Sequence, residues 1–190
     1  MTENTMPEPW PVIKTRKGPS YPIFSLRVDT AKAPHTGKEH DFYVIDSPDW
    51  VNIIPVSQDL EVVMVKQFRH GTKEITLEIP GGMVENEDSL EQAASRELLE
   101  ETGYQAREMR LLGVVHPNPA ILTNRCSTYL ALNLEKVNDG DGDETEDIEV
   151  SLVPLKEIPT LIENGTITNS LVIAAFFWYF LDVIKNSVHL

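Results

Sequence analysis

Three glutamates, Glu97, Glu100 and Glu101, stand at positions i, i+3 and i+4 of one segment. On a helix these spacings bring the side chains to one face, where like charges repel by roughly 0.2–0.5 kcal/mol per pair. A small hard cation such as Mg2+ reverses this repulsion because it binds carboxylate oxygens together with the phosphate oxygens of a substrate. A glycine pair, Gly81 and Gly82, precedes the segment. The spacing therefore predicts a site for a divalent metal ion and a phosphate-containing ligand.

The sequence marks both ends of the helix that carries these glutamates. Ser89 or Asp88 can cap its start, and a Gln or Glu three residues later completes a capping box. Gly103 follows the last turn and is typical of a helix stop. We therefore predict a helix from Leu90 to Glu101. Without a ligand, such a charge run would be an ordinary solvated helix face.

The same residues resemble the Nudix box, whose pattern is Gly, five residues, Glu, seven residues, then Arg-Glu-apolar-any-Glu-Glu-any-Gly-apolar. Here the pattern starts at Gly82 and continues through Arg96-Glu97-Leu98-Leu99-Glu100-Glu101-Thr102-Gly103-Tyr104. Asp88 replaces the first glutamate of the pattern. In the family that residue is peripheral and helps to hold the box arginine, so the resemblance implies that the metal-binding residues are complete.

The rest of the chain alternates between strand and helix patterns, which indicates an α/β protein. The predicted strands are enriched in β-branched and apolar residues and span 41–46, 51–56, 60–68, 75–79, 111–116, 127–132 and 148–153. Further helices are expected near 154–164 and 171–184. The Nudix resemblance implies an α/β/α sandwich around a mixed sheet over residues 44–190. Residues 1–43 are expected to form a small N-terminal β element, with a strand pair before about Thr30 and a possible dimer contact.

Length and composition agree with a soluble enzyme of ordinary domain size, because 190 residues can bury a sizeable core. The 30 acidic and 16 basic residues give a formal charge of -14. This charge argues against sequence-independent binding of nucleic acid, which needs clustered Lys and Arg. A small molecule held through a metal ion is the expected partner.

Nothing in the sequence favours an oxidising compartment or a membrane. Cys126 is the single cysteine, so no intrachain disulfide can form, and the first residues do not have the pattern of a secretory signal. The apolar segment 171–184 is shorter than the roughly 20 residues that span a bilayer and contains Asp182. We expect a cytoplasmic protein whose last helix is buried or faces a dimer partner.

Residues outside the box indicate the substrate class. The run VMVKQFRHGTKEITLEIPGG resembles the ADP-ribose and nucleoside diphosphate sugar branch of the Nudix hydrolases, with Arg69 and Glu78 carrying the match. An arginine suits bidentate contact with a diphosphate. Arg69 could equally be a surface residue that closes a strand. Glu78 could pair with Arg69 or accept a hydrogen bond from a ribose hydroxyl.

Other residues are candidates for recognition of the base and sugar. Pro119 stands where ADP-ribose pyrophosphatases have a proline, and Ala-Ile-Leu at 120–122 excludes the tyrosine typical of diadenosine polyphosphate hydrolases. Phe24 could stack on a base across the interface of a homodimer, as in related dimeric enzymes, although core packing is the alternative. Asn118 could recognise the sugar or the nucleoside.

A second acidic cluster, NDGDGDETEDIEV, spans residues 138–150. Its spacing does not match a calcium-binding EF-hand loop. The segment Glu144-Thr145-Glu146-Asp147-Ile148 resembles a loop that supplies the catalytic base and one further metal ligand in ADP-ribose pyrophosphatases. A base on such a loop can act when the loop closes over substrate. The alternative is an acidic loop without a catalytic part.

These patterns together predict hydrolysis of a diphosphate linkage to a nucleoside monophosphate and a sugar phosphate, with Mg2+ as cofactor and Mn2+ as a substitute. The expected metal ligands are the Gly81 carbonyl, Glu97, Glu101 and Glu146, with Glu100 beside them. Glu144 is the preferred general base and Glu100 the alternative. Two other functions stay open, namely a Nudix enzyme that removes nucleoside triphosphates and a Nudix-fold sensor that binds nucleotide sugars without cleaving them.

Overall fold

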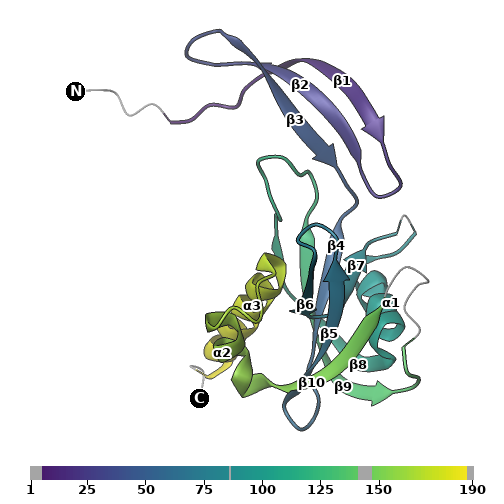
Figure 1. The fold of residues 1–190 in the computed structure, drawn as a ribbon. Helices are drawn as coiled ribbons and strands as arrows, with labels where there is room; N and C mark the ends of the chain where they lie inside the picture. Colours follow the sequence, from purple (N-terminus) through teal and green to yellow (C-terminus); the bar gives the residue numbers. More distant parts are fainter. Residues whose placement is uncertain (1–5, 86, 141–146, 188–190) are drawn as a thin grey trace. The chain divides into compact units, whose positions relative to one another are not determined.

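The structure is a computed structural model that describes residues 6–85, 87–140 and 147–187. The chain divides into two compact units (Figure 1). The N-terminal unit comprises Met1–Pro48 and Asn118–Asn124, and the second unit comprises Asp49–Pro117 and Arg125–Leu190. The division thus lies at Pro48, whereas the sequence suggested residue 43, and residues 118–124 join the N-terminal unit.

The N-terminal unit is an antiparallel three-stranded sheet. Its strands follow one another in the order β1 (Val12–Ser20), β2 (Ser25–Lys32) and β3 (Glu39–Asp46). The segment 118–124 adds to β3, where the Ile45 amide donates to the Ile121 carbonyl at 2.7 Å. Every residue of β1 is exposed. Ala31 and Ala33 are the buried apolar residues among those that the structure describes here, so this sheet has almost no core of its own.

The second unit has two sheets and helices on both faces of one of them (Figure 1). The first sheet has the order β7-β4-β9-β8, and the second has the order β10-β5-β6. Strands β4 and β9 are parallel and the other pairs are antiparallel, so the first sheet is mixed, as predicted. The strands are β4 (Trp50–Pro55), β5 (Glu61–Arg69), β6 (Glu74–Glu78), β7 (Gly81–Met83), β8 (Tyr104–Val115), β9 (Cys126–Lys136) and β10 (Ile148–Pro154). The helices are α1 (Leu90–Thr102), η1 (Leu155–Glu157), α2 (Ile158–Glu163) and α3 (Ser170–Ser187).

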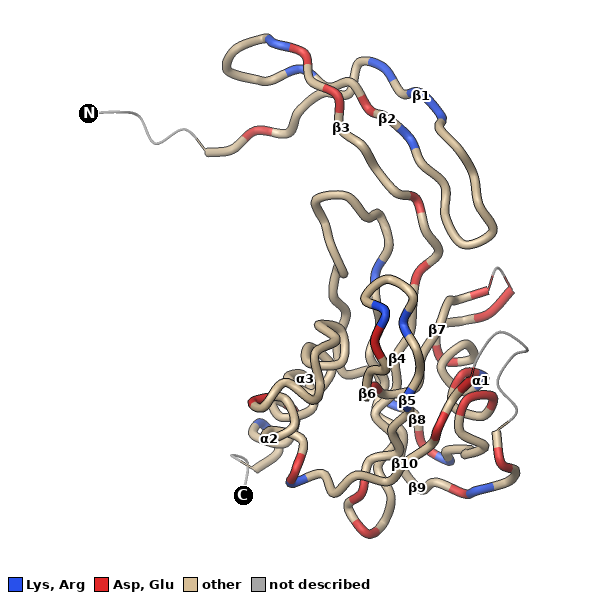
Figure 2. The backbone as a smooth tube through the Cα atoms, viewed as in Figure 1, with Lys and Arg blue, Asp and Glu red and all other residues tan. Residues whose placement is uncertain are grey.

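Two hydrophobic clusters hold the helices to the sheets. Val51 and Ile53 of β4 pack on the side of α1 with Leu98, whereas Ile54 packs with Phe176 of α3 on the other side. This alternation follows from the period of two residues in a strand. Burial of each such side chain contributes about 1.5–3 kcal/mol. Acidic residues recur along α1 (red in Figure 2).

Two strands differ from the sequence-based prediction. Strand β7 was not predicted because Gly81–Met83 is short and rich in glycine. Strand β8 begins at Tyr104, whereas the sequence indicated Leu111. Among the strands that the structure describes, it pairs with β9 alone and lies at the edge of its sheet. Polar residues in its first half therefore face solvent and obscure the strand pattern.

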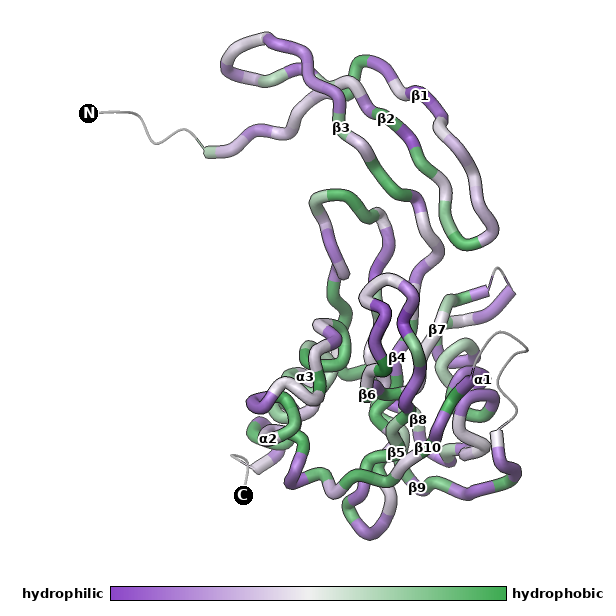
Figure 3. The backbone as a smooth tube through the Cα atoms, in the orientation of Figure 1, coloured by the Kyte–Doolittle hydropathy of each residue, from purple (hydrophilic) through white to green (hydrophobic). Residues whose placement is uncertain are grey.

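Helix α3 packs against the sheet along one side. Its residues Ala175 and Phe176 are fully buried, and Asp182 binds Arg110 of β8 through two hydrogen bonds of 2.7 and 2.8 Å. The Trp178 ring lies so close to Gly113 that a Cβ there would be 2.4 Å from it. By length and composition alone, this apolar helix (Figure 3) could also cross a membrane, but these contacts occupy its inner side.

Candidate active site

Local sequence fixes both ends of α1. Ser89 is the N-cap: its hydroxyl accepts a hydrogen bond from the Gln92 amide at 3.2 Å, and the Gln92 side chain accepts from the Ser89 amide at 2.9 Å. Gly103 ends the helix in the left-handed conformation with φ of 70°, which glycine adopts without strain. Of the two predicted caps, Ser89 is therefore the one used, and the helix extends one residue past its predicted end to Thr102.

Two glutamates of α1 lie against the glycine pair of β7. Glu101 is 3% exposed, and its Oε2 accepts a hydrogen bond from the Gly81 amide at 3.0 Å. A Cβ on Gly82 would lie 2.4 Å from Oε1 of Glu97, and a Cβ on Gly81 would lie 2.4 Å from the Val51 carbonyl oxygen. Both glycines are therefore needed, because any side chain at these positions would displace a carboxylate or a strand.

Arg96 holds the acidic face in place. Its guanidinium donates to Asp88 at 3.2 Å, to Glu97 at 3.0 Å and to Glu100 at 3.0 Å, and it also binds the Met83 carbonyl. Burial lowers the pKa of Arg96, but the charge of Glu97 and the hydrogen bonds that Arg96 donates to Asp88 and Glu100 outweigh this effect, so the pKa is raised. The shorter side chain of Asp88 thus still reaches the box arginine, as the family pattern implied.

The donors beside the glycine pair suit a hard divalent cation. Mg2+ is usually bound through one or two carboxylates while it keeps waters or substrate phosphate oxygens. Glu97 and Glu101 provide two carboxylates next to the Gly81–Gly82 backbone. Within the described ranges no three His, Cys, Asp or Glu side chains form a metal-binding group, so these residues make a partial set. Glu100 is 52% exposed and points to Arg96.

A bidentate ion pair joins two of the predicted substrate-binding residues. Arg69 Nε and Nη2 donate to Oε1 and Oε2 of Glu78 at 3.0 and 2.8 Å. The Thr76 hydroxyl donates to Oε1 at 2.6 Å, and the Asn169 amide donates to Oε2 at 2.8 Å. Burial raises the pKa of Glu78. The bonds from Arg69 and Thr76, the charge of Arg69 and the Asn169 bond lower it by a larger amount, so the net pKa lies below its usual value. Glu78 is therefore the partner of Arg69, one of the two roles that the sequence allowed.

Two further predicted site residues belong to the N-terminal unit. Phe24 belongs to the N-terminal unit, where its ring contacts Tyr21 with centroids 5.0 Å apart. Asn118 belongs to the same unit, and its side chain accepts a hydrogen bond from the Ala120 amide at 3.3 Å. Glu144 and Glu146 lie outside the described residues.

The structure adds residues that sequence reasoning missed. Asn169 at the start of α3 and Thr76 on β6 both contact Glu78. Asparagine before an apolar helix is a recognisable cap signal, but no local pattern indicates a partner 91 residues away.

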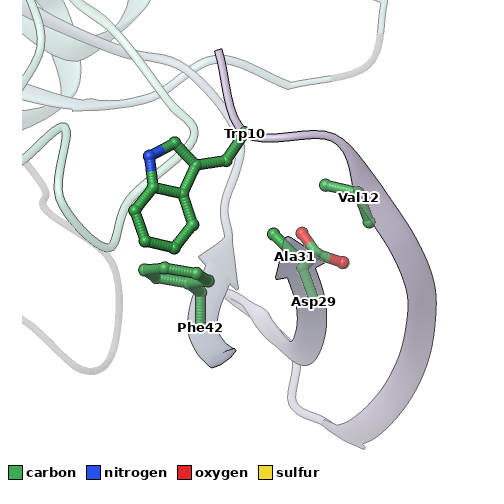
Figure 4. A pocket seen from close by; sticks show the side chains of 5 residues that line it. All are labelled: Trp10, Val12, Asp29, Ala31 and Phe42. Atoms are coloured by element: carbon green, nitrogen blue, oxygen red, sulfur yellow. The ribbon is translucent and has the colours of Figure 1, made fainter. Parts of the chain in front are cut away.

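In the N-terminal unit, an apolar hollow of about 320 Å³ is lined by Trp10, Val12, Asp29, Ala31 and Phe42 (Figure 4).

Comparison with known proteins places this site in a family. Residues 47–176 match the NUDIX domain, and the chain belongs to the Nudix family. It is 30% identical over 143 residues to an ADP-ribose pyrophosphatase of Bacillus subtilis, covering 75% of this chain and 77% of that protein. It is 29% identical over 164 residues to a methanol dehydrogenase activator of Bacillus methanolicus, covering 86% and 88%.

Further similarities point to the same class. The chain is 30% identical over 137 residues to a GDP-mannose pyrophosphatase of Citrobacter koseri, covering 67% of this chain and 71% of that protein. The crystal structure of an ADP compounds hydrolase superposes with a TM-score of 0.85 at 19% identity, covering 96% and 98% of the two chains. The predicted fold class and the resemblance to this Nudix branch are therefore confirmed, and the chain is a Nudix pyrophosphohydrolase.

Proposed function

We propose that the protein hydrolyses the diphosphate linkage of ADP-ribose or of a nucleoside diphosphate sugar, with Mg2+ as cofactor and Mn2+ as a substitute. The products are a nucleoside monophosphate and a sugar phosphate. The observation that carries this proposal is the packing of Glu97 and Glu101 against the Gly81–Gly82 backbone. That arrangement brings two carboxylates to the same short stretch of backbone, and such negative charge is stable only with a cation or with fixed donors nearby. The relatives named for ADP-ribose and GDP-mannose support the substrate class.

The proposed residues form two groups, namely those that bind the metal ion and those that accept the proton of the attacking water. Glu97, Glu101, the Gly81 carbonyl and Glu146 would hold Mg2+. When bound, Mg2+ neutralises phosphate charge and lowers the pKa of the attacking water. Glu144 accepts the proton of that water, and Glu100 is the alternative base. Arg96 keeps Glu97 in place through its hydrogen bond of 3.0 Å.

Arg69 and Glu78 form the proposed grip on the diphosphate. The Arg69 side chain is 43% exposed while that of Glu78 is 4% exposed, so the pair presents its positive partner to solvent. A guanidinium with a fixed orientation can donate two parallel hydrogen bonds to phosphate oxygens. Phe24 and Asn118 are proposed to bind the base and the sugar.

A substrate panel tests this proposal. The purified protein is incubated with ADP-ribose, GDP-mannose and other nucleoside diphosphate sugars, and separately with nucleoside triphosphates, each with Mg2+, with Mn2+ and with EDTA. We expect AMP and ribose 5-phosphate from ADP-ribose, and no product with EDTA. Preference for triphosphates would indicate a triphosphate-removing enzyme. Binding of ADP-ribose without any product would indicate a sensor.

We also propose that the protein is a cytoplasmic homodimer. The N-terminal sheet exposes apolar side chains that a monomer leaves in water, namely Trp10, Val12, Ile13, Tyr21, Ile23, Phe42 and Tyr43. Many exposed apolar side chains on one small element are typical of an interaction site, and a second copy of this sheet would cover part of them. Light scattering of the purified chain should give twice the monomer mass of 21.4 kDa. Cell fractionation should recover the protein with cytoplasmic markers.

A further inference from the structure

Asn169 begins helix α3 and acts as its N-cap. Its carbonyl accepts the first intrahelical hydrogen bond, from the Ile173 amide at 3.0 Å. Its side-chain Oδ1 accepts from the Leu171 amide at 2.9 Å. For this capping task Asn, Asp and Ser are nearly equivalent, because each offers one short oxygen acceptor. Capping therefore explains a small polar residue at this position but does not require asparagine.

The other half of the Asn169 amide contacts the buried carboxylate of Glu78. Nδ2 donates to Oε2 at 2.8 Å, and the same oxygen accepts from Arg69 Nη2 at 2.8 Å. Asparagine is the short side chain that carries an acceptor and a donor together, whereas an ionised aspartate has only acceptors. Capping alone would accept Asn, Asp or Ser. Capping together with donation to Glu78 requires asparagine.

All four contacts fix the plane of the Glu78 carboxylate. Oε1 accepts from Arg69 Nε and from the Thr76 hydroxyl, and Oε2 accepts from Arg69 Nη2 and Asn169. Because Arg69 binds both oxygens, its guanidinium takes its orientation from this carboxylate. Asn169 and Thr76 are the contacts that hold the carboxylate itself against rotation. Removing either one loosens the plane in which Arg69 is presented.

We propose that Asn169 is a positioning residue for substrate, which aligns the Glu78–Arg69 pair for the diphosphate. This inference rests on the proposed function of Arg69. It makes the first turn of α3 part of the substrate site, although Asn169 itself does not touch the substrate. Asn52 of β4, which pairs with Gly81, also reaches this turn, because its side chain donates to the Leu171 carbonyl at 3.3 Å. The start of α3 therefore contacts both Glu78 and the strand that pairs with Gly81.

Two substitutions separate positioning from capping. Asn169→Ser keeps a capping oxygen, but one hydroxyl cannot occupy the positions of both Oδ1 and Nδ2. Asn169→Ala removes the cap and the donor together. Asn164→Ser is the matched control, because Asn164 also makes a local bond, accepting from the Thr166 amide at 3.0 Å, in the turn after α2. For each variant we would measure the Tm, and the KM and kcat for ADP-ribose with saturating Mg2+.

Positioning predicts that KM and Tm change independently. A hydrogen bond to a charged group corresponds to roughly tenfold in an equilibrium constant, so KM should rise by up to about tenfold in both Asn169 variants, with kcat nearly unchanged. The Tm should fall more in Asn169→Ala than in Asn169→Ser, because both variants lose the bond to Glu78 but only alanine also removes the cap. Asn164→Ser should match the wild type in KM and kcat.

Other outcomes overturn the inference in distinguishable ways. A wild-type KM in Asn169→Ser, with a change only in Asn169→Ala, would show that Asn169 acts as a cap alone. Arg69→Lys is assayed in parallel: if it raises KM while Asn169→Ser does not, the positioning role fails and the proposed function stands. If neither variant changes KM, Arg69 does not bind substrate, and both proposals for this corner fail. If the wild type cleaves nothing in the panel, the proposed function fails first.

Discussion

The Gly81 amide donates to the Glu101 carboxylate at 3.0 Å and joins the glycine pair to the last turn of α1. Glu101 is 3% exposed, and a buried carboxylate is costly unless donors or a cation compensate it. This bond holds the Gly81 backbone beside the Glu101 side chain. Two residues that carry proposed metal ligands are therefore in direct contact.

Glu101→Gln should remove nearly all turnover while the fold persists. The Gln side-chain oxygen can still accept from Gly81, but the charge that attracts a metal is gone. Loss of a supporting residue at a metal site typically costs 10–100-fold, so loss of a ligand should exceed about 100-fold in kcat. Without metal the Tm should rise slightly, because one member of a mutually repelling set is neutral.

The matched control for this variant is Glu91→Gln, which removes an exposed charge from the first turn of the same helix. We expect its turnover to equal that of the wild type. Near-wild-type turnover with normal Mg2+ dependence in Glu101→Gln would exclude Glu101 as a ligand. Circular dichroism of both variants would verify that each is folded.

Gly82→Ala should disturb the metal site through Glu97. The added Cβ would lie 2.4 Å from Oε1 of Glu97, so the carboxylate has to move. We expect a higher Mg2+ concentration for half-maximal activity, and a loss of about 1–3 kcal/mol in unfolding free energy from overpacking. Gly71→Ala is the control, because a Cβ there meets no atom within 4 Å. Equal Mg2+ titration curves for the two alanine variants would contradict the proposed place of Glu97.

Arg69→Lys tests the grip on the diphosphate. Lysine keeps the positive charge but loses the planar pair of donors that binds both oxygens of Glu78. Substrate binding should weaken by about 1.5–3 kcal/mol if a bidentate contact to the diphosphate is lost, which appears as a higher KM. The control is Arg107→Lys in the exposed pair with Glu135, which should leave KM unchanged. An unchanged KM in Arg69→Lys would make Arg69 a structural residue that closes β5.

Local features of this fold were predictable from sequence, whereas distant pairings were not. The start and end of α1 follow from Ser89 and Gly103, because caps depend on neighbouring residues only. The metal-binding pattern is equally local. The contact of Asn169 with Glu78 joins residues 91 positions apart. Helix and strand periodicity in the sequence cannot predict a contact at this distance. This contact results from the packing of α3 within the second unit.

Edge and surface position explain the remaining differences. The first half of β8 is polar because this strand pairs on one side only, so its sequence resembles a loop. Residues 118–124 join the N-terminal unit through hydrogen bonds with Ile45. The sequence around Asn118 contains turn residues and no strand alternation, and thus gives no indication of that partner.

The depressed pKa of Glu78 predicts acid sensitivity. Its ordinary value is 4.5 and folding lowers it, so the charged pair stabilises the fold above about pH 4.5, and this contribution disappears as pH falls through the lower folded pKa. Glu78→Gln should destabilise the protein by about 1–2 kcal/mol at pH 7, less than a fully buried pair because Arg69 is 43% exposed. Urea unfolding at several pH values should show this difference shrinking toward pH 3. A constant difference would contradict the linkage.

Two roles are proposed for the acidic segment around Glu144, a general base and a metal ligand, and kinetics can distinguish them. If Glu144 is the general base, Glu144→Gln should lower kcat by roughly 10²–10⁴-fold with little change in KM or in Mg2+ saturation, because proton transfer contributes only in the transition state. If Glu146 is a metal ligand, Glu146→Gln should instead raise the Mg2+ concentration for half-maximal activity. Asp139→Asn, an exposed residue of the same acidic stretch, is the control and should leave all three quantities unchanged.

Wild-type kinetics in Glu144→Gln and Glu146→Gln would indicate that the general base is a residue of α1. Glu100 is then the remaining candidate, since it is 52% exposed and accepts a hydrogen bond from Arg96 at 3.0 Å. Glu100→Gln should in that case lower kcat as steeply as expected for Glu144→Gln, whereas it should have a smaller effect if Glu144 is the base.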